Sequence, residues 1–354
     1  MRGDPLALAF LAVACLAPAT GLDRPFPPVR GEPSGAVQEG RAERVELGRL
    51  LFFDPVLSRD GTLSCAHCHR PEHALSDGRP TPLGAGGVPL ARNAPTLYNV
   101  AFKERLFWDR RAASLEEQAL GPLLSPDELG ADPDALPARL GAIPEYRRRF
   151  VAAFPGEAEA VSLANVARAL AAFERTLVSA DSRYDRFARG ERAALTPAER
   201  RGLTLFRSLN TRCFECHRLP TFEAPLAMGI GVPSQDPGIG GAAGRPGQTG
   251  LFAVPTLRNV ARTAPYMHDG SLATLEEVVE FYRQGGGRPL GVDGDRIHEH
   301  VRPFEIRDDE AADLVAFLNA LTDESSRPAT PEAVPSGLPV LGERRFVARE
   351  EDRP

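Results

Sequence analysis

Two short segments of the sequence share a pattern of residues that can form covalent and metal bonds. In each segment, two cysteines separated by two residues are followed at once by a histidine. The residues are Cys65, Cys68 and His69 in the first segment and Cys213, Cys216 and His217 in the second. In a Cys-x-x-Cys-His motif, the thiols bond to the vinyl groups of a haem and the histidine ligates its iron. The sequence therefore predicts two covalently bound c-type haems, each with one histidine ligand.

The N-terminal residues have the features of an export signal. Leu6–Val13 is an apolar run behind a basic residue, and it is too short to span a bilayer. The small residues Ala17 and Ala19 mark a cleavage site, so we place a signal peptide at residues 1–20. Alternatively Cys15, the one cysteine outside the two motifs, becomes a lipidated N-terminus. Both interpretations predict export to the periplasm, which attachment of a c-type haem also requires.

Length and composition indicate a globular chain. Its 354 residues are enough for two domains, and 42% hydrophobic with 25% charged residues is typical of a folded protein. The 33 glycines and 33 prolines indicate long loops around compact helices. A formal net charge of −6 gives no sign of nucleic-acid binding, and we expect no transmembrane span.

An internal repeat surrounds the two motifs. Gly48–Phe52 precedes the first motif and Gly202–Phe206 precedes the second, and both read Gly-x-x-Leu-Phe on a helical apolar period. After each motif and a loop rich in Gly and Pro comes a second matching pair, Pro95–Ala101 and Pro255–Ala261. This duplication predicts a mainly α fold made of two cytochrome c-like helical domains with long Gly/Pro loops.

Capping patterns mark the starts of several expected helices. Ser114 and Thr274 each begin a Ser/Thr-x-x-Glu capping box at matching positions of the repeat, and Thr196 begins another. Each half closes with an apolar stripe at helical spacing. The stripes are Val166, Leu170, Phe173 and Leu177 in the first half and Leu314, Phe317, Leu318 and Leu321 in the second. We place the domains at residues 36–190 and 191–325, with a tail of little structure at 326–354.

The repeat predicts that the two haem irons differ on the side opposite the histidine. Eight positions after the capping residue Thr274 lies Tyr282, and eight positions after Ser114 lies Pro122. A phenol can ligate iron as phenolate, whereas proline has no donor side chain. The second haem is therefore expected to be closed by Tyr282, and the first to be open.

Other residues remain candidates at the second iron. They are Met267, Met228 and His268, of which Met267 is the strongest rival because Met often pairs with His in cytochromes c. Trp108 is the single tryptophan and aligns with His268 in the repeat. It fits both a packed aromatic at the domain boundary and a relay for electrons between the haems, and these roles are compatible.

These features together resemble the bacterial di-haem cytochrome c peroxidase superfamily over about Glu43 to Thr322. The segments that carry the resemblance are Leu47–Pro55, Arg92–Thr96, Phe107–Asp109 and Thr263–Gly270. Within the superfamily, the chain is most similar to MauG-like proteins, including those associated with methanobactin biosynthesis. Tyr282 stands where standard peroxidases of this family have Met, and the loop at 75–92 lacks their distal His.

The resemblance implies roles for residues around the open haem. Gln118 and Glu128 match the distal pair, with Glu128 as the acid–base group, and Pro122 matches the pocket proline. Trp108 matches the inter-haem tryptophan. The resemblance also implies a calcium ion between the domains, held by Asn93 and the backbone carbonyls of Thr263 and Pro265, since oxygen ligands suit this ion.

The resemblance finally implies a function for the exported protein. Hydrogen peroxide would react at the open haem, and a partner protein would be oxidised through the second, Tyr282-ligated haem. One alternative is a cytochrome c peroxidase that reduces hydrogen peroxide with electrons from a small cytochrome or cupredoxin. Another is a di-haem electron carrier without catalysis, in which both irons are six-coordinate.

Overall fold

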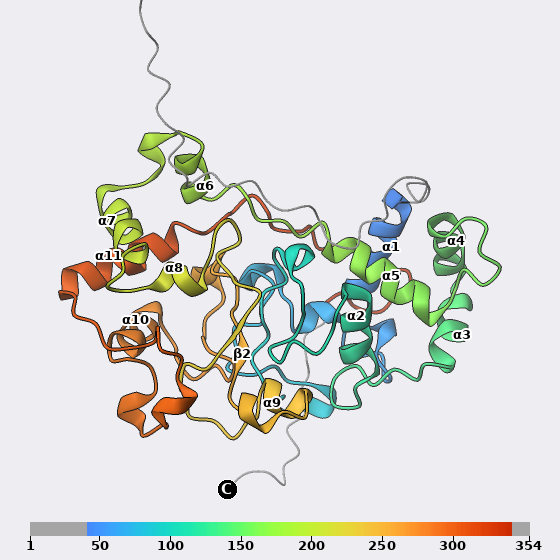
Figure 1. Ribbon diagram of the computed structural model, residues 1–354. Helices are drawn as coiled ribbons and strands as arrows, with labels where there is room; N and C mark the ends of the chain where they lie inside the picture. Colours follow the sequence, from blue (N-terminus) through green and yellow to red (C-terminus); the bar gives the residue numbers. More distant parts are fainter. Residues whose placement is uncertain (1–40, 342–354) are drawn as a thin grey trace, which may run out of the picture.

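The computed structural model describes residues 41–341 (Figure 1). The predicted signal peptide, Cys15 and the last part of the tail lie outside the described residues. The predicted mainly α fold is confirmed, because helices and short turns of 3₁₀ helix account for almost all regular structure in the described range. The described strands are β1 (Ala227–Met228) and β2 (Phe252–Ala253), which form one antiparallel pair.

The α-helices fall into two groups, at the right and the left of Figure 1. The first group contains α1 (Arg41–Phe53), α2 (Leu115–Leu124), α3 (Ala135–Gly141), α4 (Pro144–Ala153) and α5 (Leu163–Glu174). The second contains α6 (Arg183–Ala188), α7 (Pro197–Phe206), α8 (Cys213–Cys216), α10 (Leu275–Arg283) and α11 (Asp308–Asn319). The short α9 (Ile239–Ala242) lies at the lower edge, in the loop that follows the second motif.

One close helix crossing organises each half, and the two crossings are equivalent. In the first half α1 crosses α5 at Gly48, where an added Cβ would lie 1.9 Å from the carbonyl oxygen of Ala169. In the second half α7 crosses α11 at Gly202, where an added Cβ would lie 1.9 Å from the carbonyl oxygen of Asp313. Only glycine permits this approach, so the repeated Gly-x-x-Leu-Phe segment sets the packing of both halves.

Side-chain caps begin the helices that follow, as their sequences predict. The hydroxyl of Ser114 accepts a hydrogen bond from the backbone NH of Glu117 at 3.1 Å, and α2 starts at the next residue. At the start of α10 the hydroxyl of Thr274 accepts from the backbone NH of Glu277 at 3.1 Å. The carboxylate of Glu277 accepts in return from the backbone NH of Thr274 at 3.2 Å. These caps fix the start of α2 and α10, and with it the position of every later side chain on the two helices.

Each half has its own buried core. The first contains residues between Leu47 and Leu177, and the second contains residues between Tyr184 and Leu321. The segment after α11 returns to the first core, where Val334 is buried and Ser336 donates a hydrogen bond to the carboxylate of Asp54 at 2.6 Å. This segment, red in Figure 1, forms no helix up to residue 341 but ties the two halves together.

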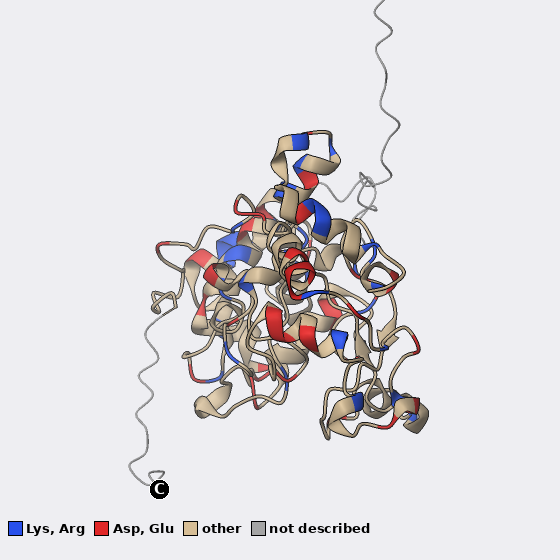
Figure 2. Cartoon of the chain, turned by 90° about the vertical axis from the view of Figure 1, so that its left-hand side faces the viewer, with Lys and Arg blue, Asp and Glu red and all other residues tan. Residues whose placement is uncertain are grey.

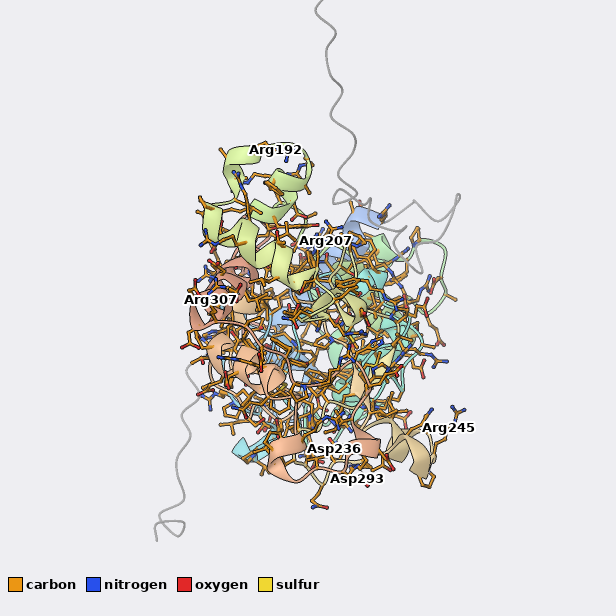
Figure 3. All side chains as sticks on the ribbon, turned by 60° about the vertical axis from the view of Figure 1, so that its left-hand side comes forward. Arg192, Arg207, Asp236, Arg245, Asp293 and Arg307 are labelled. Carbon is orange, nitrogen blue, oxygen red and sulfur yellow. The ribbon has the colours of Figure 1, made fainter. Side chains whose placement is uncertain are left out.

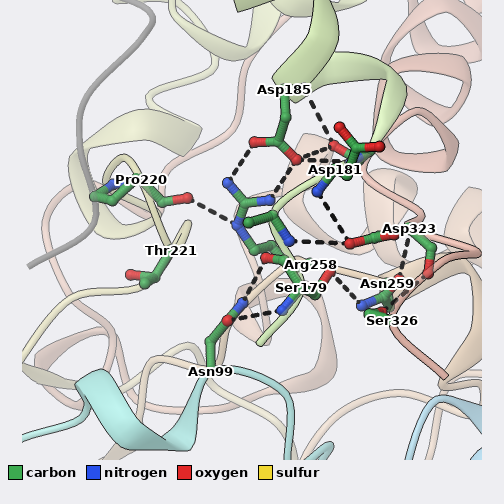
Figure 4. Close-up of polar contacts among 12 residues, drawn as sticks. Asn99, Ser179, Asp181, Asp185, Pro220, Thr221, Arg258, Asn259, Asp323 and Ser326 are labelled. Carbon is green, nitrogen blue, oxygen red and sulfur yellow. Dashed lines mark hydrogen bonds and ion pairs between the residues drawn. The ribbon is translucent and has the colours of Figure 1, made fainter. Parts of the chain in front are cut away.

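Polar contacts join the halves at their junction (Figure 4). Asn99 accepts from the backbone NH of Ser179 at 3.1 Å, and its repeat counterpart Asn259 donates to the hydroxyl of Ser179 at 2.9 Å. Beside them the buried guanidinium of Arg258 makes two hydrogen bonds of 2.7 Å to Asp185. The junction is therefore a satisfied polar network, in which the same two asparagines meet one serine.

We expect Gly48→Ala to lower the free energy of unfolding by about 1–3 kcal/mol, because its Cβ forces α1 away from α5. Gly141→Ala is the matched control, since nothing lies within 4 Å of its added Cβ. That change should be neutral or stabilise the helix by about 0.5–1 kcal/mol. Urea unfolding of the haem-loaded protein measures both, and equal stability of Gly48→Ala and the wild type would contradict the close crossing.

Candidate active site

A large cavity of about 1010 Å³ lies beside the first motif, at the boundary of the two halves. His69 and Cys68 line it, and the same two residues line an adjoining cavity of about 60 Å³ together with Cys65. A smaller cavity of about 250 Å³ lies beside the second motif and is lined by Cys213, Cys216 and His217. The thiols and the imidazole of each motif therefore lie in the walls of cavities on their own side of the molecule.

Both motif histidines are held in the same way. Nδ1 of His69 donates to the carbonyl oxygen of Leu75 at 2.9 Å, and Nδ1 of His217 donates to that of Phe222 at 3.0 Å. Because a carbonyl only accepts, this hydrogen bond leaves the Nε2 lone pair for a metal. Burial lowers the pKa of both histidines, which keeps the imidazoles neutral. Neutral imidazole beside a pair of unbridged thiols is the donor set that a c-type haem requires.

Tyr282 lies in the wall of the second cavity, on α10. Burial raises the pKa of its phenol, and the nearby thiols of Cys216 and Cys213 raise it further. Without a cation in the cavity the phenol therefore stays protonated, and only a metal would favour the phenolate. Met228, Met267 and His268 line the same cavity, so the alternative ligands also lie within this site.

The predicted distal residues all line the first cavity. Gln118 and Pro122 lie one turn apart on α2, and Glu128 follows in the loop after the helix. Burial raises the pKa of Glu128 and Asp127 adds to the effect, while Arg111 opposes it. Pro122 occupies on α2 the place that Tyr282 occupies on α10, because both lie eight residues after their N-cap.

Trp108 lines both cavities. Its indole NH donates to the carbonyl oxygen of Asn93 at 2.9 Å, and its own carbonyl accepts from the backbone NH of Ala253 at 2.8 Å. One hydrogen bond is thus made to each half of the chain. The indole is held at the boundary between the two cavities.

Comparison with known proteins identifies the family. Residues 42–193 match the family model of di-haem cytochrome c peroxidases. The methylamine utilization protein MauG of Methylorubrum extorquens is 39% identical over 293 residues, which cover 82% of this chain and 81% of that protein. This chain belongs to the di-haem cytochrome c peroxidase family.

Other relatives place it within that family. The cytochrome c551 peroxidase of Nitrosomonas europaea is 34% identical over 325 residues, covering 90% of each protein. The crystal structure of a MauG-like protein associated with microbial copper homeostasis superposes with a TM-score of 0.76 at 38% identity, covering 86% of this chain and 96% of that one. The similarity to MauG and to the MauG-like structure supports the MauG-like branch, and the family is one of oxidoreductases with two haems.

Two of the predicted calcium ligands, Asn93 and Pro265, are in contact. The amide nitrogen Nδ2 of Asn93 donates to the carbonyl oxygens of Arg79, Pro80 and Pro265 at 3.0, 3.2 and 3.4 Å. Thr263 lines the same cavity as Asn93 and Pro265. These three carbonyl oxygens accept from an amide NH2 group, and the calcium site stays a prediction. Residues 41–341 hold no group of three or more His, Cys, Asp or Glu side chains that could bind a metal.

Arg92 is a site residue that sequence reasoning missed. Its guanidinium donates to the carboxylate of Asp109 at 2.7 Å and to that of Asp236 at 2.6 and 2.8 Å. Asp109 follows Trp108 and Asp236 lies in the loop before α9, so Arg92 links these two segments. Figure 3 shows Asp236 at the lower end of the molecule. Ion pairs between residues so far apart in the chain leave no local sequence signal.

Within 41–341 no helix is long and apolar enough to cross a bilayer. In Figure 2, segments with basic residues and segments with acidic residues are interspersed along the ribbon.

We expect two covalent haems per chain, and only one after Cys213 and Cys216 are both changed to Ala, because the second haem then has no thiol to bond to. The mass of the exported protein and its pyridine haemochrome spectrum count them. Glu215→Gln, inside the same motif, is the control and should retain both. A wild-type chain with one haem would contradict the assignment.

Proposed function

We propose that this chain is an exported enzyme of MauG type, which uses hydrogen peroxide at the first haem site to oxidise a partner protein through the second. The observation that carries the proposal is the pair Pro122 and Tyr282, at equivalent places on α2 and α10 and each in the wall of its own cavity. Pro122 offers no ligand and leaves room for peroxide, whereas Tyr282 offers an oxygen donor. The bound haems supply the exchange of electrons with peroxide.

In this proposal Glu128 moves the protons of the reaction. Its carboxylate takes a proton from the peroxide oxygen that binds first and returns it to the oxygen that leaves. A raised pKa suits the first step, because burial makes the carboxylate a stronger base than an exposed one. Gln118, whose amide has both donors and acceptors, orients the peroxide beside it.

Trp108 provides the route for electrons between the two sites. It lines both cavities, and its hydrogen bonds to Asn93 and Ala253 hold the indole at a fixed position between them. Calcium at Asn93, Thr263 and Pro265 would stiffen the loops that place this indole. Electrons for the reaction then come from a residue of the partner protein, outside this chain, in the periplasm.

A second candidate function is that of a cytochrome c peroxidase fed by a small cytochrome or cupredoxin. Two observations favour it, namely the similarity to cytochrome c551 peroxidase and the presence of Met267 in the second cavity. Rapid turnover of peroxide with a reduced small cytochrome, at the rate of a dedicated peroxidase, would establish this function instead. A non-catalytic electron carrier would leave its spectrum unchanged when peroxide is added.

Glu128→Gln should slow the reaction with hydrogen peroxide by about 10²–10⁴-fold, because an amide cannot take up the proton. Stopped-flow absorbance of the haem-loaded protein measures this rate. Asp127→Asn removes the neighbouring, exposed carboxylate and should leave the rate within a few-fold. Equal rates for Glu128→Gln and the wild type would exclude Glu128 as the acid–base group.

Tyr282→Met should raise the midpoint potential of one haem, because a neutral thioether replaces an anionic oxygen that stabilises the ferric state. Tyr266→Phe is the control, since Tyr266 lines the same cavity but donates to the carbonyl of Val260 at 3.1 Å. Potentiometric titration followed by absorbance gives both values. If Tyr282→Met leaves the potentials in place and Met267→Leu changes one, the ligand is Met267.

A further inference from the structure

Glu174 is a buried carboxyl group in the first haem cavity that the reaction described above does not use. It is the last residue of α5, its exposed fraction is 6%, and it lines the cavity together with Cys65 and Glu128. Its Oε2 atom is buried and has no hydrogen-bond partner. Most buried polar atoms are paired, so an unpaired carboxyl oxygen at a cofactor site calls for a functional explanation.

The internal repeat shows that this carboxyl is not required for packing. Gly48 lies against Ala169 and Phe173 of α5, and Gly202 lies against Asp313 and Phe317 of α11 in the same order. The residue after Phe173 is Glu174. The residue after Phe317 is Leu318, which is 8% exposed and lines the second cavity. The same place therefore holds an acid in the half with Pro122 and a hydrocarbon in the half with Tyr282.

The charged groups around Glu174 leave its carboxyl largely uncompensated. Burial raises the pKa of Glu174 to about 8, Arg175 lowers it, and Glu116 on α2 raises it. Arg175 is paired with Glu116 at 2.8 Å, so its charge is shared with that carboxylate. Burial raises the pKa of the Cys65 thiol, and Glu174 and, more weakly, Glu128 raise it further, which places both acids within electrostatic reach of the first motif.

We propose that Glu174 is the redox-linked proton site of the first haem cavity. Its carboxylate takes up one proton from solvent when the haem at Cys65, Cys68 and His69 gains one electron, and the carboxylic acid releases that proton when the electron leaves. The physical reason is charge balance: reduction removes one positive charge from a cavity of low dielectric, where a carboxylate then lacks compensation. Proton and electron enter together, and the net charge of the cavity stays constant.

This role differs from that of Glu128. Glu128 moves protons to and from peroxide, whereas Glu174 responds to the charge of the haem. The inference rests on the presence of a haem at the first motif, which the family establishes, and not on the choice between the two proposed activities. Because Leu318 replaces the acid in the second half, the second haem is expected to lack this coupling.

The test is the pH dependence of both midpoint potentials, measured by spectroelectrochemistry on the full-length protein with two haems and without peroxide. In the wild type, the reduction equilibrium constant of one haem should fall about tenfold per pH unit around neutrality, the value for one proton per electron. The other haem should show a weaker dependence. A loss of peroxide activity has no bearing on this measurement, so failure of the proposed function would be seen separately.

Two variants decide the assignment. Glu174→Leu copies the residue of the second half, and Glu174→Gln keeps the shape of the side chain without an ionisable group. Both should reduce the tenfold dependence to that of the other haem. Glu116→Gln is the control, because it removes a carboxylate outside the cavity that raises the pKa of Glu174 but leaves the Glu174 carboxyl in place. It should keep the tenfold dependence and move it to lower pH. The proposal is overturned if both Glu174 variants keep the tenfold dependence, or if Glu116→Gln abolishes it.

Discussion

Each half of this protein depends on the hydrogen bond between a motif histidine and a backbone carbonyl a few residues further on. The carbonyls of Leu75 and Phe222 fix which nitrogen of the imidazole carries the proton and which faces the cavity. The two thiols, on the turn before the histidine, would hold the haem beside it. Residues of α2 line the first cavity and residues of α10 line the second. In the proposed function, the side chains of these two helices would set the chemistry of each iron.

The duplication makes the differences between the halves informative. Where both halves need the same packing, the residues agree, as at Gly48 and Gly202 or at Asn99 and Asn259. Where the sites differ, the residues diverge on a shared backbone. Pro122 in the first half corresponds to Tyr282 in the second. Trp108 likewise corresponds to His268, and Glu174 to Leu318. All six of these residues line the two cavities.

Much of this arrangement could be predicted from local sequence. The capping residues Ser114 and Thr274 set the register of α2 and α10, and that register is what aligns Pro122 with Tyr282. The haem attachment residues follow from a motif whose spacing is set by covalent chemistry. Family membership and the helical fold were also expected from the repeat and from the segments that resemble the peroxidases.

Contacts between distant residues could not be predicted in this way. Arg92 binds Asp236, and Ser336 binds Asp54, because the tertiary fold brings these distant segments together. The periodicity of the sequence gives no sign of such contacts. Glu174 is a similar case, since an acid at the end of a helix is usually exposed, and its burial follows only from the crossing of α5 with α1. The choice among Tyr282, Met267, Met228 and His268 stays open for a related reason, because all four line one cavity.

The central claim is that the first iron has a free coordination position and the second does not. The electron paramagnetic resonance spectrum of the resting ferric protein tests it most directly, recorded before and after addition of hydrogen peroxide. The account predicts one high-spin and one low-spin ferric signal, both lost on addition of peroxide. Two low-spin signals that peroxide leaves unchanged would contradict it.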